Sequence, residues 1–122
     1  MIKPKVIILY GTKPMANSSS ETVMLDNHQV ITFFVAEGVS ASGSCIRRVI
    51  ATNEEGEEKI VVSDNKGFSA TGQTIEIPVD ADLLAKEGFD RVLFRFASVS
   101  GTAPQCCVWA IPTNERYSEG GN

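Results

Sequence analysis

The sequence predicts an all-β protein folded as an antiparallel β-sandwich of about seven to eight short strands, Ig-like or jelly-roll-like in arrangement. Short runs of β-branched and aromatic residues recur along the chain, and glycine, proline, asparagine or serine separates each run from the next. One short segment, near residues 81–87, has a helical pattern, whereas a parallel sheet would need a helix between its strands. The predicted strands span residues 5–10, 22–25, 29–36, 45–52, 59–63, 73–79, 91–99 and 105–111.

One early strand is expected at the centre of a sheet. Residues 29–36 are apolar on both faces, which is typical of a strand covered on each side. Two loops are expected in this half of the chain, because residues 12–20 are polar and residues 37–44 contain Gly38 and Gly43.

Two turns are expected around the next pair of strands. The acidic run at residues 53–58 and the Asp-Asn-Lys-Gly sequence at residues 64–67 have the composition of tight turns. Before them, strand 45–52 places Ile46 on one face and Arg47 on the other, because side chains alternate along a strand.

The helical turn follows a cleanly alternating strand, residues 73–79. Pro78 points outward there and cannot donate a ladder hydrogen bond, so this strand is expected at an edge or near its own end. Asp80 or Asp82 can cap the helical turn, and Gly88 ends it.

The last two strands supply aromatic residues to the predicted core. Strand 91–99 points Phe94 and Phe96 inward, and Phe96 is expected to meet Phe34 between the sheets. Strand 105–111 closes the sandwich.

The 122 residues form one predicted domain, 1–122, with a polar N-terminal arm at residues 1–4 and a polar C-terminal tail at residues 112–122. Chain ends of this kind can reach a neighbouring protein, and arginine and tyrosine are favoured at interfaces. The residues expected to contact a partner are Lys3, Lys5, Pro112, Arg116 and Tyr117.

Composition restricts the kinds of partner. The net charge is −4 and no basic residues cluster, so no nucleic-acid partner is expected. The apolar runs are far shorter than the roughly 20 residues that span a bilayer, and the N-terminus does not have the form of a signal peptide, so no membrane partner is expected. Three cysteines without a secretion signal predict reduced thiols in a cytosol.

The catalytic inventory is thin, so the chain is not expected to be an enzyme. The sole histidine, His28, follows a turn and is not part of any nucleophile motif. Asp80 and Asp82 are explained as helix caps, and the acidic residues of 53–58 as a solvated turn. Neither zinc-ligand spacing, nor a calcium loop, nor a phosphate-binding loop is present, so no cofactor or metal is expected. A hydrolase is the remote alternative.

Aromatic residues on strands are expected to pack in the core, but one of them could bind a ligand. Trp109 shares one face of the last strand with Cys107 and Ile111. An alternative function is therefore a surface carbohydrate- or receptor-binding module in which Trp109 stacks on a sugar.

The second half of the chain resembles small structural proteins of tailed-bacteriophage virions. In that group a strand similar to TIEIPVDADLL leads through a "GFD" corner into an alternating strand, and the chain closes with an apolar strand and a Pro-Arg-Tyr-like ending, which the sequence NERY replaces here. The early segment LDNHQV also resembles theirs. The matching segments are residues 25–30, 74–84, 88–93 and 108–117, within a resemblance that spans residues 22–117.

The resemblance implies a virion structural protein that binds the outer surface of a phage capsid as a cement or decoration protein and stabilises the shell. Its partners would be the major capsid protein and copies of itself, for example as a trimer about a capsid symmetry axis. It would be made in the host bacterial cytoplasm and end on the capsid surface of the virion. A tail, neck or connector component is a further alternative, and the family offers no catalytic residues.

Overall fold

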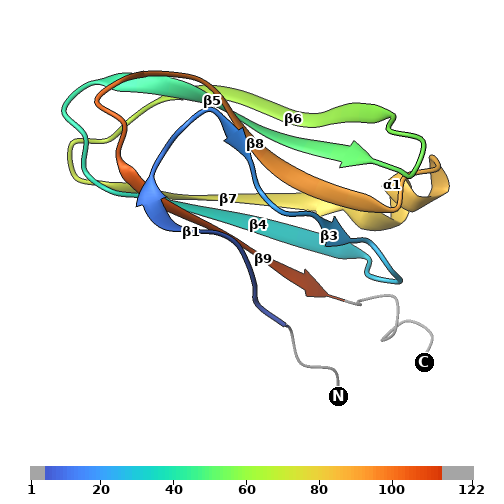
Figure 1. Ribbon diagram of the computed structural model, residues 1–122. Helices are drawn as coiled ribbons and strands as arrows, with labels where there is room; N and C mark the ends of the chain where they lie inside the picture. Colours follow the sequence, from blue (N-terminus) through green and yellow to red (C-terminus); the bar gives the residue numbers. More distant parts are fainter. Residues whose placement is uncertain (1–4, 114–122) are drawn as a thin grey trace.

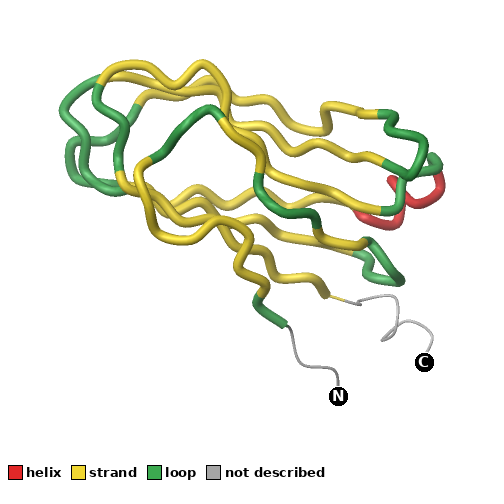
Figure 2. Tube along the Cα trace, viewed as in Figure 1, coloured by secondary structure: helices red, strands yellow, loops and turns green. Residues whose placement is uncertain are grey.

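The computed structural model describes residues 5–113, which form two antiparallel β-sheets packed face to face (Figures 1 and 2). The predicted all-β sandwich is therefore confirmed. The elements in chain order are β1 (Ile7–Pro14), β2 (Ser18–Ser19), β3 (Val23–Met24), β4 (Val30–Glu37), β5 (Gly43–Thr52), β6 (Glu58–Gly67), β7 (Gln73–Asp80), α1 (Ala81–Lys86), β8 (Arg91–Gly101) and β9 (Gln105–Thr113).

The chain changes sheets at most of its connections. Sheet A has the strand order β1-β9-β4-β7, and sheet B has the order β2-β8-β5-β6, with β3 also paired to β8. Within the described residues, β5 and β6 are the one pair of consecutive strands that hydrogen-bond to each other. In Figure 1, sheet A forms the lower layer, sheet B the upper layer, and α1 lies at one end of the sandwich.

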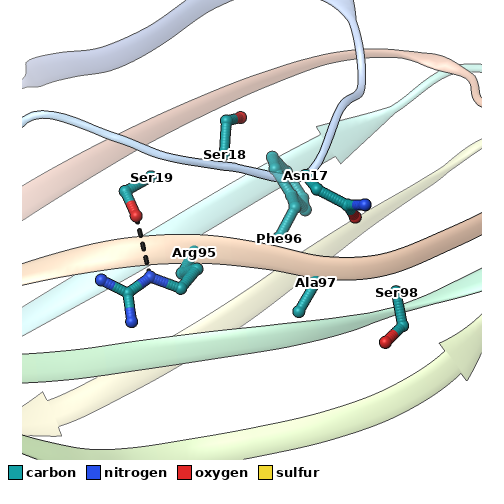
Figure 3. A pocket seen from close by; sticks show the side chains of 7 residues that line it. All are labelled: Asn17, Ser18, Ser19, Arg95, Phe96, Ala97 and Ser98. Atoms are coloured by element: carbon teal, nitrogen blue, oxygen red, sulfur yellow. Dashed lines mark hydrogen bonds between the residues drawn. The ribbon is translucent and has the colours of Figure 1, made fainter.

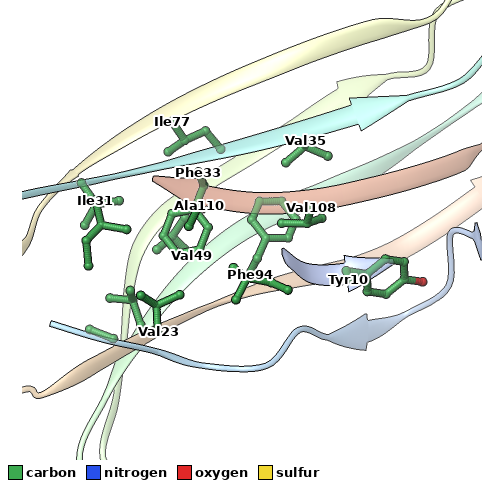
Figure 4. Packing of buried hydrophobic residues seen from close by; sticks show 14 of the residues in the cluster. Tyr10, Val23, Ile31, Phe33, Val35, Val49, Ile77, Phe94, Val108 and Ala110 are labelled. Atoms are coloured by element: carbon green, nitrogen blue, oxygen red, sulfur yellow. The ribbon is translucent and has the colours of Figure 1, made fainter. Parts of the chain in front are cut away.

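Aromatic side chains from both sheets fill the centre of the core (Figure 4). The ring of Phe33 on β4 lies 6.3 Å from that of Phe94 on β8, and Phe94 lies 4.9 Å from Phe96. The Tyr10 ring meets Phe96 edge-on at 5.5 Å. Each fully buried aromatic side chain contributes about 1.5–3 kcal/mol. The predicted contact between Phe34 and Phe96 is wrong, because Phe33 and not Phe34 points inward on β4.

Two stretches predicted as a loop and a turn are partly strand. Within residues 12–20, β1 continues to Pro14 and β2 pairs with β8. Residues 64–67 do not turn but extend β6, where Asp64 lies opposite Arg47 of β5. Strand pairing with a distant partner outweighs local turn composition here, because β-propensity depends strongly on context.

The last strand is longer than the sequence predicts. β9 continues through Pro112 and Thr113, and Pro112 lies opposite Ile31 of β4. Pro112 is buried, so two residues of the predicted tail belong to the sandwich. The rest of the predicted tail, and residues 1–4 of the predicted arm, lie outside the described residues.

The predictions for β7 and the helix are confirmed. β7 is an edge strand of sheet A, so the missing amide proton of Pro78 interrupts no interior ladder. Asp80 caps α1, because its Oδ1 accepts a hydrogen bond of 3.0 Å from the Leu83 amide. Gly88 follows the helix with φ of 97°, a conformation that favours glycine. No helix among residues 5–113 has the length and apolarity needed to cross a membrane.

Two facing glycines allow β5 and β8 to approach closely at one end of sheet B. Gly43 and Gly101 are register partners with φ of 112° and 77°. A Cβ on Gly43 would lie 2.1 Å from the Ser100 carbonyl oxygen, and a Cβ on Gly101 would lie 2.5 Å from the Gly43 Cα. Only glycine fits at both positions.

Candidate binding surface

The outward side of sheet A is an uncharged, mostly apolar surface over its two central strands. On β4 and β9, alternate residues face the core and are almost fully buried, so the residues between them point outward. The outward residues of these two strands are all uncharged: Val30, Thr32, Phe34, Ala36, Gln105, Cys107, Trp109, Ile111 and Thr113. We call this surface, with the flanking outward residues of β1 and β7, the sheet A face.

An aromatic pair stands at the middle of the sheet A face. Phe34 and Trp109 are cross-strand partners, and their rings stack with centroids 5.5 Å apart and an interplanar angle of 9°. On the next strand, Ile8 is the register partner of Trp109, and on the other side Glu76 is the partner of Phe34. One row across the sheet therefore reads Ile8, Trp109, Phe34 and Glu76.

The β1 border of the sheet A face exposes large aliphatic side chains. Ile8 is 59% exposed and Val6, just before β1, is 55% exposed. The sequence predicts β4 to be covered on both faces. The structure confirms this for the core side, but no described element covers the outward side (Figure 1).

The outward side of sheet B carries both apolar and charged side chains, including exposed Ile60 on β6. Ile50 and Leu93 are register partners on this side, yet they are only 1% and 8% exposed. The next row contains Arg48 opposite Arg95, and long charged side chains can cover apolar neighbours with their aliphatic stems. Arg95 also forms a 3.2 Å ion pair with Glu58 of β6.

A buried ion pair joins the two sheets across the interior. Arg47 of β5 donates two hydrogen bonds, of 2.6 and 2.7 Å, to the carboxylate of Glu37 on β4, and both side chains are fully buried. Arg47 also donates to the carbonyl oxygen of Lys66 at 2.9 Å, and Gln73 donates to Glu37 at 3.0 Å. The pair is thus paired and hydrogen-bonded as a buried charge requires.

The ion pair is a structural feature that the sequence predicted only in part. The alternation in β5 placed Arg47 on the side opposite Ile46 without assigning either side to the core, and the structure shows that Arg47 points to the core. Its partner could not be named, because Glu37 was expected in a loop. A signal was present in hindsight: Glu37 continues the inward series of Ile31, Phe33 and Val35 at spacing two.

A shallow depression of about 430 Å³ lies between β2 and β8 (Figure 3). The Arg95 guanidinium at its edge donates to Ser19 Oγ at 2.8 Å, and the Asn17 Oδ1 accepts from the Val99 amide at 2.9 Å. These polar groups are already used within the chain, so the depression offers weak chemistry for a ligand. Its lining residues are Asn17, Ser18, Ser19, Arg95, Phe96, Ala97 and Ser98.

The groups that nucleophilic catalysis would use are not assembled in the described residues. Burial raises the pKa of the Cys45 thiol to about 11 and that of Cys106 to about 12, so neither is an activated thiol. The Nδ1 of His28 is buried without a hydrogen-bond partner among the described residues. No group of three or more His, Cys, Asp or Glu side chains within residues 5–113 is arranged to hold a metal ion.

The predicted partner-contact residues fall into three groups. Lys5 is exposed beside the β1 border of the sheet A face. Pro112 is buried in β9 and presents little surface to a partner. Lys3, Arg116 and Tyr117 lie outside the described residues. Sequence reasoning missed the sheet A face itself, although the apolar outward positions of residues 29–36 were its signal.

The geometry of Trp109 does not favour sugar stacking. Phe34 covers one face of the indole, and Ile8 is its cross-strand neighbour on the other side. A sugar that stacks on tryptophan needs a free ring face. The stacked Phe34 ring therefore leaves at most one face of the indole for a sugar.

No protein-family model matches the chain, and no curated protein sequence matches it. Among solved structures, the fold is similar to that of the SPBc2 prophage-derived protein YomS, with a TM-score of 0.58, 17% sequence identity, and coverage of 90% of this chain and 92% of that one. A chain from the disulfide-linked pili of Bacillus endospore appendages aligns with a TM-score of 0.39 and 13% identity, over 90% of this chain and 87% of that one. The similarity to YomS shows a shared fold.

Proposed function

We propose that this chain is a structural protein of a phage particle, which binds the outer surface of the capsid as a cement or decoration protein and stabilises the shell. The observation that carries the proposal is the fold shared with a prophage-derived protein over nearly the full length of both chains. The resemblance of residues 22–117 to small virion proteins, stated from the sequence, points the same way. The major capsid protein is the proposed partner.

The chemistry of the described residues supports a role in binding and not in catalysis. The chain has a closely packed core, a buried ion pair between its sheets and an uncovered apolar face, which together suit a rigid module that attaches to other proteins. A cement protein needs only a modest interface per copy, because the symmetry of the shell repeats each contact many times.

The test is to add purified protein to capsids that lack it and to measure co-sedimentation and heat resistance of the particles. We expect saturable binding and a higher temperature of genome release. Absence of binding, with unchanged heat resistance, would remove the cement role. Separating heads from tails before measuring composition distinguishes this role from that of a tail, neck or connector component, which the same shared fold supports.

The chain ends can be tested in the same assay. A deletion should begin at Asn114, because Pro112 and Thr113 belong to β9 and their loss would damage the sandwich. If the predicted tail reaches a neighbouring subunit, the chain that ends at Thr113 stays folded and binds capsids more weakly. A second variant replaces only Lys5 by alanine, since Lys5 is the described member of the predicted N-terminal contacts, and it should also bind capsids more weakly.

A further inference from the structure

We propose that the sheet A face pairs with the same face of a second copy of this chain, as a two-fold symmetric dimer. Two sheets packed face to face normally bury their apolar sides against each other at a spacing of about 10 Å. Sheet A has apolar residues on both sides, and the described residues cover only one of them. An antiparallel sheet with a solvated side normally alternates apolar with polar residues, and the central strands of sheet A do not.

The size of the sheet A face is adequate for a dimer. Four strands spaced about 4.8 Å apart, each about eight residues long with a rise of about 3.3 Å, span about 500 Å². Buried on both copies, this area reaches the roughly 1,000 Å² at which specific interfaces begin.

The sheet A face is self-complementary about an axis parallel to its strands. The midline of the strand order β1-β9-β4-β7 lies between β9 and β4. A two-fold rotation about that line places Trp109 of one copy over Phe34 of the other, because the two residues share a row. The same rotation places Ile8 over Glu76 of the other copy, since these residues stand at the two ends of that row.

Charge at the two borders favours the same arrangement. The β7 border is acidic, with exposed Glu76 and Asp80, while exposed Lys5 lies just before β1 at the opposite edge of the sheet. Lys5 lies three residues before Ile8, and Asp80 lies four residues after Glu76 on the antiparallel side. The rotation therefore brings Lys5 near Asp80 of the second copy. The perpendicular two-fold axis would instead set each border against itself, acid against acid.

The experiment measures the mass of the purified full chain by sedimentation across a range of concentrations. We expect a monomer–dimer equilibrium with a dissociation constant in the micromolar range, as a small interface supports. Trp109 is the sole tryptophan, so its emission should shift to shorter wavelength as the dimer forms and removes water from its ring.

Substitutions at Ile8 test both the face and the axis. Ile8→Glu should weaken association about tenfold or more, because it adds a charge beside the acidic border of the second copy. Ile8→Lys should be tolerated much better, since it meets Glu76. The matched controls are Ile60→Glu and Ile60→Lys: Ile60 is 55% exposed on the outward side of sheet B, against 59% for Ile8. These controls should leave association unchanged.

A second variant isolates the charge pairing without damage to the fold. Asp80→Asn keeps a good helix cap while it removes the charge, so α1 stays intact. We expect association to weaken about two- to fivefold, the effect of one exposed ion pair, and the effect to vanish at high salt. Circular dichroism and thermal unfolding of each variant show that the sandwich remains folded.

Several results would overturn the dimer. They are a wild-type chain that stays monomeric at high micromolar concentration, equal effects of Glu at positions 8 and 60, and a Trp109 emission shift that follows added glycan or added capsid but not protein concentration. The dimer goes beyond the proposed virion role, so it can be disproved while that role still holds. A monomeric chain that still binds capsids would exclude the dimer and leave the proposed function standing.

Discussion

The outward sides of the two sheets differ in the charged residues that stand beside their apolar residues. On sheet B, Ile50 and Leu93 are apolar but nearly inaccessible, and the neighbouring row carries Arg48 and Arg95. On sheet A, the outward residues of the central strands include no charged side chain that could cover the rest. The comparison shows that side-chain alternation alone does not tell whether an outward apolar residue is covered by its own chain or left for a partner.

The buried ion pair between Arg47 and Glu37 links the two sheets, and its removal should cause the largest loss of stability. Glu37→Ala should reduce the free energy of unfolding by about 3–5 kcal/mol, because it leaves the Arg47 guanidinium buried without a counter-charge. The measurement is urea unfolding. The matched control, Glu58→Ala, breaks the exposed pair with Arg95 and should cost less than about 1 kcal/mol. Similar costs for both variants would mean that water reaches the interior pair.

Removing one side chain from each outward side shows how much each side contributes to the stability of the monomer. Trp109→Ala should lower the stability of the monomer by about 2 kcal/mol, because it loses both buried area and the stacked ring of Phe34. Arg95→Ala should cost about 0.5–1 kcal/mol, since its ion pair is exposed. Unfolding is measured at low protein concentration, so that association does not contribute. A larger loss from Arg95→Ala than from Trp109→Ala would show that the charged side chain of sheet B contributes more to stability than the aromatic pair of sheet A.

Thiol labelling reports which side of sheet A is open. Cys107 points to the sheet A face, whereas Cys106 points to the core and Cys45 lies in the core from sheet B. With a pKa of about 11 for Cys45 and about 12 for Cys106, about 0.1% or less of either buried thiol is ionised at pH 8. At a protein concentration low enough to keep the chain monomeric, we therefore expect one fast label per folded chain and three after unfolding in denaturant, as counted by mass spectrometry. Two fast labels on folded protein would show that the core opens.

The smallest expected effect is a pH dependence confined to the charged side of the molecule. Hydrogen bonds from Arg95 lower the pKa of Glu58 below its ordinary value of 4.5. The folded carboxylate is favoured over the unfolded one, so its stabilisation is complete above about pH 4.5 and is lost as pH falls through the lower folded pKa. The stability difference between wild type and Arg95→Gln should thus be a few tenths of a kcal/mol at pH 6 and shrink toward pH 3. A difference that grows in acid would contradict this sign.

The sequence by itself determined the local features, because they depend on short-range chemistry. The alternation of residues 73–79 and 91–99, the cap at Asp80, the stop at Gly88 and the edge position of Pro78 all follow from side-chain spacing and backbone preference. The charged turn at 53–58 is likewise local: the Asn53 Oδ1 accepts from the Glu57 amide at 3.1 Å. The class of fold follows from the recurrence of such strands.

Only the tertiary structure decided which strands meet, because strand pairing depends on residues far apart in the chain. The chain changes sheets at most connections, so neighbours in sequence were seldom neighbours in space. The Asp-Asn-Lys-Gly segment is a strand because it pairs with β5. Pro112 belongs to β9, and not to the predicted tail, because it pairs with β4. The same long-range contacts buried Glu37 against Arg47, and set Trp109 beside Phe34 on a side of sheet A that no described element covers.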